Sequence, residues 1–413
     1  MTSINSSRFG EFGSAARLLA SGVATLALAA CGSDAGSPAA GQPIAAATAL
    51  SVSTLLFEEK ALSASGQQAC ASCHANETAH ADPVGTTLPV GGAAMNRQGS
   101  RSSPSMLYLE SNGPFRFASD GEPFGGFTWD GRANTRADQA GGPLLDAAEM
   151  DNASVAEVAG RLRKLSYYTD FRTVFGLATD AGDQQIFDTL RLALEQYQKL
   201  DTDYLLFNSR YDRWMDGTGT LTAQEQRGLA IFENPTRGNC ASCHPSRPAS
   251  DGSRPVFTTF GYAALGVPRN PGIAANADPT FFDMGLCGPK RTDLTTRTDL
   301  CGKFKIPTLR NIELTAPYFH NGAVATLNEA VAFYATRDID PQRWYPLAGG
   351  GVDRFNDLPV NLRGNVIQSA PFGLQPGDPP RLTAADTADL VAFLRTLTDD
   401  RTAPQAPARV ATP

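Results

Sequence analysis

The chain has no excess of positive charge and no long apolar run. Its 35 Lys and Arg residues are outnumbered by 42 Asp and Glu, a formal charge of −7, which argues against a nucleic-acid-binding protein. No uninterrupted apolar stretch reaches the roughly 20 residues that a bilayer-spanning helix needs. Charged residues make up only 19% of the 413 positions, whereas glycine and proline number 39 and 28. We therefore expect long loops between helices rather than a dense helical bundle.

Histidine and cysteine are scarce, at four and seven residues, yet they form the same Cys-x-x-Cys-His pattern twice. At these frequencies one chance match is expected about 0.001 times per chain. A zinc site or a redox dithiol also uses Cys-x-x-Cys, but neither requires a histidine directly afterwards in both copies. The pattern is typical of c-type haem attachment. It predicts two covalently bound haems, held by Cys70, Cys73 and His74 and by Cys240, Cys243 and His244, with each histidine as an axial iron ligand.

The first 30 residues are typical of an export signal. Arg8 and Arg17 precede a short apolar run, and small residues then lead to Cys31, as in a bacterial lipobox. This pattern predicts a lipoprotein signal peptide over 1–30, a lipid-modified Cys31 and a flexible tether over 31–49. The alternative is an ordinary signal peptide with an incidental cysteine. In either case the protein is expected to be exported; with the lipid, it would be anchored in the periplasm or at an outer surface.

Helix-start signals recur along the chain, at Ser154, Thr222, Thr326 and Thr383, and each precedes a segment with apolar residues at helical spacing. The predicted fold is mainly α, with two cytochrome c-like domains joined by loops, each carrying one covalent haem. We place these domains at 50–216 and 217–400, followed by a disordered tail over 401–413.

The cysteines and histidines outside the two haem motifs are few, and this limits the roles that each can have. With four thiols attached to haem and Cys31 to lipid, Cys287 and Cys301 remain, and in an exported protein they predict a disulfide; two buried free thiols are the alternative. His80 lies too close to His74 in sequence to reach the opposite side of the same iron. The chain therefore cannot easily supply two histidines to each iron, and at least one iron is open or carries a different ligand.

Longer motifs identify a family. They are Trp129-Asp130-Gly131-Arg132-Ala133, the run from Phe304 to Asn311 and the run from Thr315 to Gly322. Together with the two haem motifs, they make residues 50–400 resemble the bacterial di-haem cytochrome c peroxidases and their relatives of the methylamine-utilisation MauG type.

The resemblance implies roles for matching residues around the first, peroxidatic haem. Its proximal ligand would be His74, and Glu149 would be the acid–base carboxylate on the opposite side, with a solvated loop acid as the alternative reading. Gln139 and Pro143 match residues of the same pocket. Trp129 matches an indole between the two haems, where it can relay an electron.

Two departures from the classical peroxidases matter. The stretch Leu88–Gly92 contains no histidine, so the first iron is expected to be open without activation, although Met95 is another candidate ligand. The second haem of the classical enzymes uses a methionine at the position of Tyr334. MauG-like members have an axial tyrosine there, which favours that branch, and Met284 is the alternative ligand.

The family also binds calcium between its domains. The resemblance places this ion at the carbonyl oxygens of Thr315 and Pro317, with Ser102 standing where the family has an asparagine. A serine oxygen is a weaker ligand. His320 is expected to contact a haem propionate rather than an iron.

Three functions follow from these features. The first is a peroxidase that reduces hydrogen peroxide to water with electrons from a small redox protein, a cytochrome c or a cupredoxin. The second is a MauG-like oxidase that withdraws electrons from Tyr or Trp of a protein substrate via a bis-ferryl state. The third is a non-enzymatic di-haem electron carrier, which would need both irons to be six-coordinate. The family also makes a homodimer possible.

Overall fold

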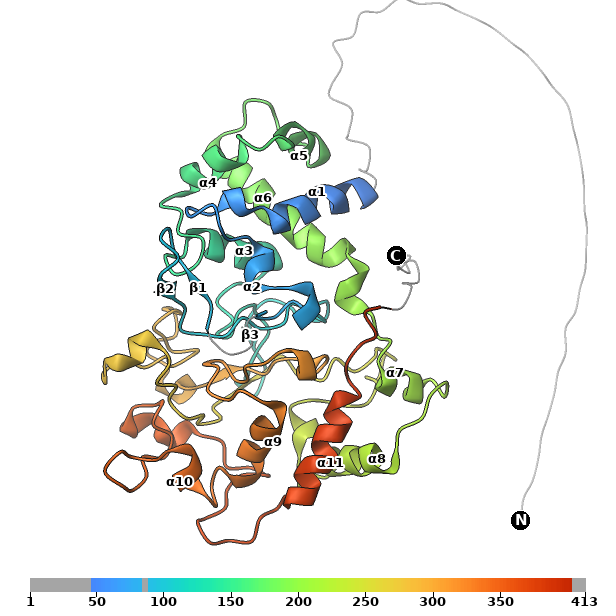
Figure 1. Ribbon diagram of the computed structural model, residues 1–413, viewed down its shortest axis with the longest axis vertical. Coiled ribbons are helices and arrows are strands. Elements are labelled where there is room, and N and C mark those ends of the chain that lie inside the picture. The colour runs from blue at the N-terminus through green and yellow to red at the C-terminus, as the bar shows by residue number, and fades with distance from the viewer. Residues whose placement is uncertain (1–45, 84–87, 403–413) are drawn as a thin grey trace, which may run out of the picture. The chain divides into compact units, whose positions relative to one another are not determined.

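Helices form most of the regular structure in the computed structural model, which describes residues 46–83 and 88–402 (Figure 1). The mainly α prediction is confirmed. Within the described ranges the α-helices are α1 (Ala46–Glu58), α2 (Cys70–Cys73), α3 (Arg136–Leu145), α4 (Val155–Leu162), α5 (Tyr168–Val174), α6 (Asp183–Leu200), α7 (Arg210–Met215), α8 (Ala223–Glu233), α9 (Leu327–Thr336), α10 (Pro341–Trp344) and α11 (Ala384–Arg395).

Three short antiparallel ladders accompany the helices, and the sequence pattern did not indicate them. Each pairs two strands of two residues, with registers Val90↔Gln98, Arg116↔Phe124 and Tyr262↔Lys305. The strands are β1 (Val90–Gly91), β2 (Arg97–Gln98), β3 (Arg116–Phe117), β4 (Pro123–Phe124), β5 (Tyr262–Ala263) and β6 (Phe304–Lys305). Strands this short carry no detectable alternation of polar and apolar residues.

The predicted helix starts are confirmed by their caps. The side chains of Ser154, Thr222, Thr326 and Thr383 each accept a hydrogen bond from a backbone N–H in the first turn of α4, α8, α9 and α11. A cap of this kind satisfies one of the backbone donors that a helix start leaves without a partner. The apolar spacing inside these helices then decides which side is buried.

Buried side chains gather in two large clusters. The first contains residues between 49 and 204, where α1, α3 and α4 pack against α6; the second contains residues between 211 and 397, where α8 and α9 pack against α11. Tyr211 of α7 belongs to the second cluster. Residues 43–413 form one unit by contact, so the division into two domains at 216 stays a prediction.

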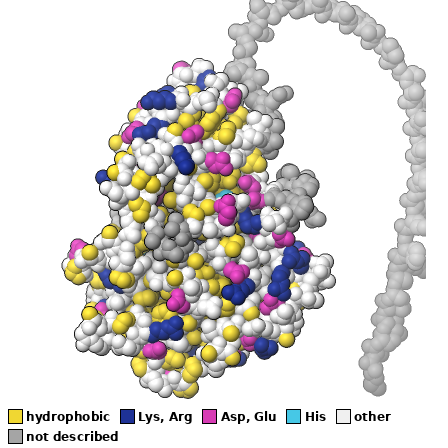
Figure 2. All heavy atoms as spheres, in the orientation of Figure 1, with side chains coloured by type: hydrophobic (Ala, Val, Ile, Leu, Met, Phe, Trp, Pro, Cys, Tyr) yellow, Lys and Arg dark blue, Asp and Glu magenta, His cyan; other side chains and the backbone are white. Residues whose placement is uncertain are grey.

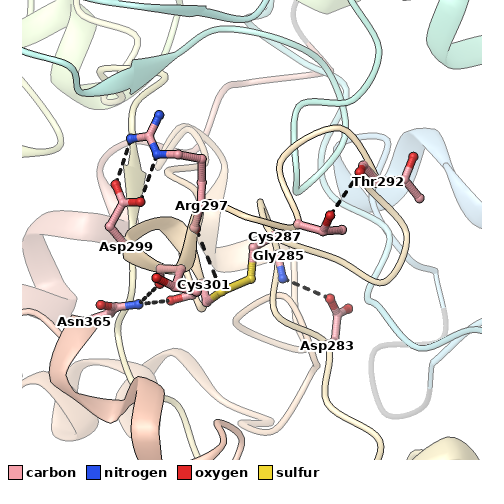
Figure 3. Close-up of a disulfide and its surroundings, with 10 residues drawn as sticks. Asp283, Gly285, Cys287, Thr292, Arg297, Asp299, Cys301 and Asn365 are labelled. Carbon is pink, nitrogen blue, oxygen red and sulfur yellow. Dashed lines mark hydrogen bonds and ion pairs between the residues drawn. A yellow bond between two sulfur atoms is a disulfide. The ribbon is translucent and has the colours of Figure 1, made fainter.

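The segment 234–326 contains no α-helix and consists of turns, short 3₁₀ helices and the strands β5 and β6. Long loops were expected from the glycine and proline content. A disulfide joins Cys287 to Cys301 in this segment, with the two Cα atoms 5.0 Å apart (Figure 3). The Asn365 amide donates hydrogen bonds to the carbonyls of Thr298 and Cys301, at 2.7 and 3.0 Å. The bonded loop is thereby held to the chain near η8 (Val360–Asn365).

Two predicted boundaries shift. The predicted tether over 31–49 is wrong for 46–49, because α1 has already begun at Ala46 and Ala49 is buried. The disordered tail predicted over 401–413 is wrong for Arg401, because its guanidinium pairs with Asp203 at 3.6 Å, and 403–413 lie outside the described residues. The signal peptide and the lipobox Cys31 lie outside the described residues. In the described part, no helix is both long and apolar enough for a membrane span.

Candidate di-haem site

A cavity of about 440 Å³ lies beside the first Cys-x-x-Cys-His motif. The motif forms the single turn of α2, and His74 directly follows that turn. The lining includes every residue predicted for the first haem site: Cys70, Cys73, His74, Trp129, Gln139, Pro143 and Glu149. The fold therefore brings together side chains that are up to 79 positions apart in the sequence.

The His74 imidazole is held from one side. Its Nδ1 donates a hydrogen bond to the backbone carbonyl of His80, at 2.8 Å. Burial lowers the pKa of His74, so the ring stays neutral. With Nδ1 carrying the proton, Nε2 is the nitrogen that can bind a metal. His80 therefore orients the His74 imidazole through its main chain, a role that the sequence did not suggest.

Glu149 follows the C-terminus of α3 in a tight turn, in which its own N–H donates to the Asp146 carbonyl at 3.0 Å. Its carboxylate lines the cavity and accepts no hydrogen bond from the described residues. Burial, with a contribution from the Asp146 charge, raises the pKa of Glu149 to about 7, against the opposing influence of Lys290 and Arg132. A carboxyl group with this pKa can both give and accept a proton near neutral pH.

The stretch Leu88–Gly92 packs directly on the Glu149 turn. The Gly92 N–H donates to the Glu149 carbonyl at 2.8 Å. A Cβ on Gly91 would lie 2.4 Å from the Ala148 carbonyl oxygen and 2.6 Å from that of Glu149. The backbones can approach this closely only because position 91 is a glycine. This segment therefore supports the carboxylate from behind.

Two α3 side chains complete the region around Glu149. Gln139 and Pro143 are one turn apart on the helix and line the same cavity. Among the described residues, His74 is the only histidine that lines it, and Met95 does not. That the first iron is open without activation stays a prediction.

A second cavity, of about 200 Å³, lies beside Cys240, Cys243 and His244. The Nδ1 of His244 donates to the Phe257 carbonyl at 2.7 Å, which repeats the arrangement of His74 and His80. Burial lowers the pKa of His244 to about 4. The imidazole is therefore neutral and presents Nε2 as a possible metal ligand.

Tyr334 lines this second cavity from α9, on the same helix face as Leu327, Ala330 and Val331. Burial raises its pKa, with a further contribution from the thiols Cys240 and Cys243 across the cavity. Within the described ranges no methionine lines the cavity, and Met284 lies outside it. The structure thus brings Tyr334, and not Met284, into the cavity that His244 lines, and ligation of an iron by Tyr334 stays a prediction.

Trp129 lines both cavities. Its indole N–H donates to the Ser102 carbonyl at 2.9 Å, and its own carbonyl accepts from the Lys305 N–H at 2.8 Å. Both contacts come from distant segments of the chain. The Ser102 contact orients the indole and the Lys305 contact fixes the main chain at the boundary of the two cavities, and a position between two haems stays a prediction.

A buried ionic network fixes the next residue, Asp130, which is fully buried. Asp130 pairs with Arg101 at 2.7 Å and with Arg132 at 2.9 Å, and Arg101 also pairs with Asp283 at 2.6 Å. The Arg101 ion pairs therefore join the first half of the chain to the segment 234–326. Sequence reasoning missed this network because no local spacing indicates pairs that are 29 and 182 residues apart.

The predicted calcium ligands Ser102, Thr315 and Pro317 all line the first cavity. The Ser102 hydroxyl donates to the Phe319 carbonyl at 2.8 Å, and the Ser102 carbonyl already accepts from Trp129. Calcium therefore stays a prediction. His320 lines the second cavity, stacked on Phe304 with ring centroids 3.4 Å apart.

The residues around both cavities fit covalent c-type haems. All four motif cysteines are free thiols, and burial raises the pKa of Cys70 to about 12, so it stays protonated. Each motif histidine is partly buried, neutral and hydrogen-bonded through Nδ1. In the described ranges, no group of three or more His, Cys, Asp or Glu could hold a metal ion.

Comparison with known proteins agrees with this chemistry. Residues 50–220 match the family described as di-haem cytochrome c peroxidase. The chain is 34% identical to the methylamine utilization protein MauG of Paracoccus denitrificans, over 84% of this chain and 88% of that protein. It is 30% identical to the cytochrome c551 peroxidase of Nitrosomonas europaea, over 76% and 83% of the respective chains.

A solved structure extends the likeness to the fold. The diheme peroxidase BthA of Burkholderia thailandensis is 39% identical and superposes with a TM-score of 0.78, over 87% of this chain and 89% of that chain. The motifs, the two cavities and these relatives together lead to one conclusion: the chain belongs to the di-haem cytochrome c peroxidase and MauG family.

Proposed function

We propose that this protein reduces hydrogen peroxide to water at the first cavity, with electrons delivered through the second. The observation that carries the proposal is the position of Glu149. Its carboxyl group faces the cavity that His74 lines, it has a pKa near neutrality, and no second histidine of the described chain competes for the same space.

His74, with its Nδ1 proton engaged by the His80 carbonyl, would hold the iron of the first haem, and Cys70 and Cys73 would carry its covalent links. When bound, this haem supplies the redox chemistry of peroxide reduction. The protein supplies an oriented ligand on one side and an acid–base group on the other.

The acid–base work falls to Glu149. Cleavage of a peroxide O–O bond needs a proton to move from one oxygen of the peroxide to the other oxygen, which then departs as water. A carboxylate with a pKa of about 7 can accept the first proton and return it. Gln139 and Pro143, one helical turn apart on α3, bound the space in which peroxide would lie next to this carboxylate.

Electron delivery falls to Trp129, which lines both cavities, as Tyr318 and Phe319 also do, and which is the aromatic residue that matches the family's indole between the two haems. Its indole N–H donates to the Ser102 carbonyl, which orients the ring, and its backbone carbonyl accepts from the Lys305 N–H, which fixes the main chain. An aromatic ring in van der Waals reach of both cavities is well placed to carry an electron between them.

A second candidate function rests on Tyr334. A phenolate axial ligand favours ferric iron and lowers the potential, which suits an oxidase that takes electrons from Tyr or Trp residues of a protein substrate. The likeness to a MauG protein supports the same candidate. Tyr334 would affect only the second haem, however, whereas Glu149 would assist peroxide cleavage at the first haem in both candidate functions.

One experiment separates these functions and the electron carrier. The purified holoprotein is mixed with hydrogen peroxide in a stopped-flow spectrometer, with and without a reduced small cytochrome c or cupredoxin. Peroxide-dependent oxidation of the donor supports the peroxidase. A long-lived oxidised spectrum that the donor does not discharge supports the protein oxidase, and no reaction with peroxide leaves only the carrier.

The proposal includes export and anchoring by a lipid on Cys31. Cys31→Ala should release the protein from the membrane fraction without loss of haem.

The electron donor is expected to be basic. Figure 2 shows Lys, Arg, Asp and Glu side chains interspersed on the face in view, and the formal charge of −7 favours a basic partner overall. Calcium bound through Ser102, Thr315 and Pro317 would be removed by a chelator and is checked by metal analysis.

A further inference from the structure

Lys305 is a buried cation at the boundary of the two cavities. It belongs to β6, its residue is 9% exposed, and it lines both cavities. Its ammonium donates to the Gly126 carbonyl and lies 5.4 Å from the Phe127 ring centroid and 5.3 Å from that of Phe260. Those contacts satisfy one of its three N–H donors and leave its charge without a counter-ion.

Every other basic side chain that lines the first cavity has a carboxylate partner. Lys305 differs from all of them, because no Asp or Glu of the described chain lies within ion-pair distance of its ammonium. The pairs are Arg101 with Asp130 and Asp283, Arg132 with Asp130, Arg136 with Glu110, and Lys290 with Asp146.

An unpaired buried ammonium is costly for a protein. Burial alone lowers the pKa of Lys305 to about 7, and no carboxylate offsets that shift. A c-type haem brings two propionate carboxylates into its cavity, so binding it introduces the anions that this part of the chain does not provide. A propionate beside Lys305 would form an ion pair with its ammonium and neutralise both charges.

The ammonium points toward the first cavity rather than the second. The two rings beside it, Phe127 and Phe260, line only the first cavity, whereas Phe304, the other residue of β6, lines only the second. The neighbour of Lys305 in β6 therefore faces the second cavity, whereas the Lys305 ammonium lies beside rings of the first cavity. Its backbone N–H meanwhile holds the Trp129 carbonyl.

We propose that Lys305 binds a propionate of the first haem and thereby sets the potential of that haem. It is a positioning residue, because it touches the periphery of the cofactor and not the reacting atoms. The inference rests on the first haem lying in the His74 cavity. It does not depend on peroxide being the substrate.

The test replaces Lys305 by Gln, which keeps a hydrogen-bond donor for Gly126 and removes the charge, and by Arg, which keeps the charge. Lys303→Gln is the matched control: Lys303 lies two residues away, pairs with Glu122 and lines neither cavity. Haem content is counted first, and both midpoint potentials are then measured by spectroelectrochemical titration without peroxide. Resonance Raman spectra report the propionate bending modes.

Loss of a unit charge at the edge of the porphyrin, at an effective dielectric constant of about 20, is expected to shift the first haem's ferric-to-ferrous ratio about tenfold at a fixed potential. For a one-electron couple this corresponds to about 59 mV, toward lower potential. The second haem should keep its potential, and Lys305→Arg should restore that of the first. Selective loss of the first haem in the Gln variant alone would also support the pairing.

An unchanged potential and propionate mode in Lys305→Gln would overturn the proposal. So would an equal shift in the Lys303→Gln control, or a shift confined to the second haem. Failure of Lys305→Arg and Lys305→Gln alike to retain either haem would show a structural role and overturn it as well. Peroxide turnover enters none of these readouts, so failure of the proposed function would be seen separately.

Discussion

Replacement of Glu149 by Gln tests the acid–base role at a single position. The amide keeps the size of the side chain but cannot take a proton from peroxide. Because general acid–base groups contribute about 10²- to 10⁴-fold, the second-order rate of reaction with hydrogen peroxide should fall at least about 100-fold at pH 8. Both haems should remain, since Glu149 holds none of the groups that attach them.

The pH dependence makes the same prediction sharper. The pKa of Glu149 is raised from 4.5 to about 7, so the carboxylate form is complete only above pH 7. The wild-type rate should therefore rise through pH 7, and at pH 5 it should be about 100-fold below its plateau, since two units below the pKa about 1% of the group is ionised. The Gln variant should be flat over this range.

The assay is stopped-flow mixing of the ferric holoprotein with peroxide between pH 5 and pH 8. Glu122→Gln is the control, because Glu122 is exposed and lines neither cavity. A Glu149→Gln variant with unchanged rate, or one that keeps the wild-type inflection near pH 7, would refute the assignment of the proton to this residue.

Four further predictions follow from the same geometry. Folding raises the Glu149 pKa from 4.5 to about 7, so the stability that protonated Glu149 contributes is complete below pH 4.5 and is lost as the pH rises through 7. At pH 8 the free energy of unfolding of Glu149→Gln, measured with denaturant, should therefore exceed that of wild type by up to about 3 kcal/mol. Tyr334→Met should raise the potential of the second haem and add a thioether charge-transfer band; an unaltered spectrum would exclude ligation by Tyr334. Gly91→Ala should displace the Glu149 turn, cost about 1–3 kcal/mol and slow the peroxide reaction at constant haem content. Arg101→Met should cost about 3–5 kcal/mol in thermal unfolding because the buried Asp283 loses its ion-pair partner and Asp130 keeps only Arg132, whereas Arg297→Met, in an exposed pair, should cost under about 1 kcal/mol.

The haem attachment sites and the helix starts were readable from the sequence because they are local. A Cys-x-x-Cys-His motif needs five consecutive residues, and a cap such as that of Thr222 on α8 needs a side chain and a backbone N–H three residues apart. The two-residue ladders escaped detection because so short a strand has no period. The start of α1 also came earlier than expected, since an alanine-rich segment suits a helix as well as a tether.

The roles of Glu149, Gln139, Trp129 and Tyr334 entered through family resemblance, and the residues alone would not have identified them. Nothing in the local sequence distinguishes Tyr334 from a buried core tyrosine. Only the chain path places it in the His244 cavity and leaves Met284 outside.

The amino-acid sequence by itself determined which residues can hold two haems, where several helices begin, and that four histidines, with His80 only six residues after His74, cannot easily supply two ligands to each iron. Tertiary structure alone decided what surrounds those groups. It brought the His80 and Phe257 carbonyls to the imidazoles of His74 and His244, and it left Lys305 without a carboxylate partner among the described residues. The physical reason is that ion pairs, burial and shifted pKa values depend on which distant segments meet, and no sequence spacing encodes those meetings.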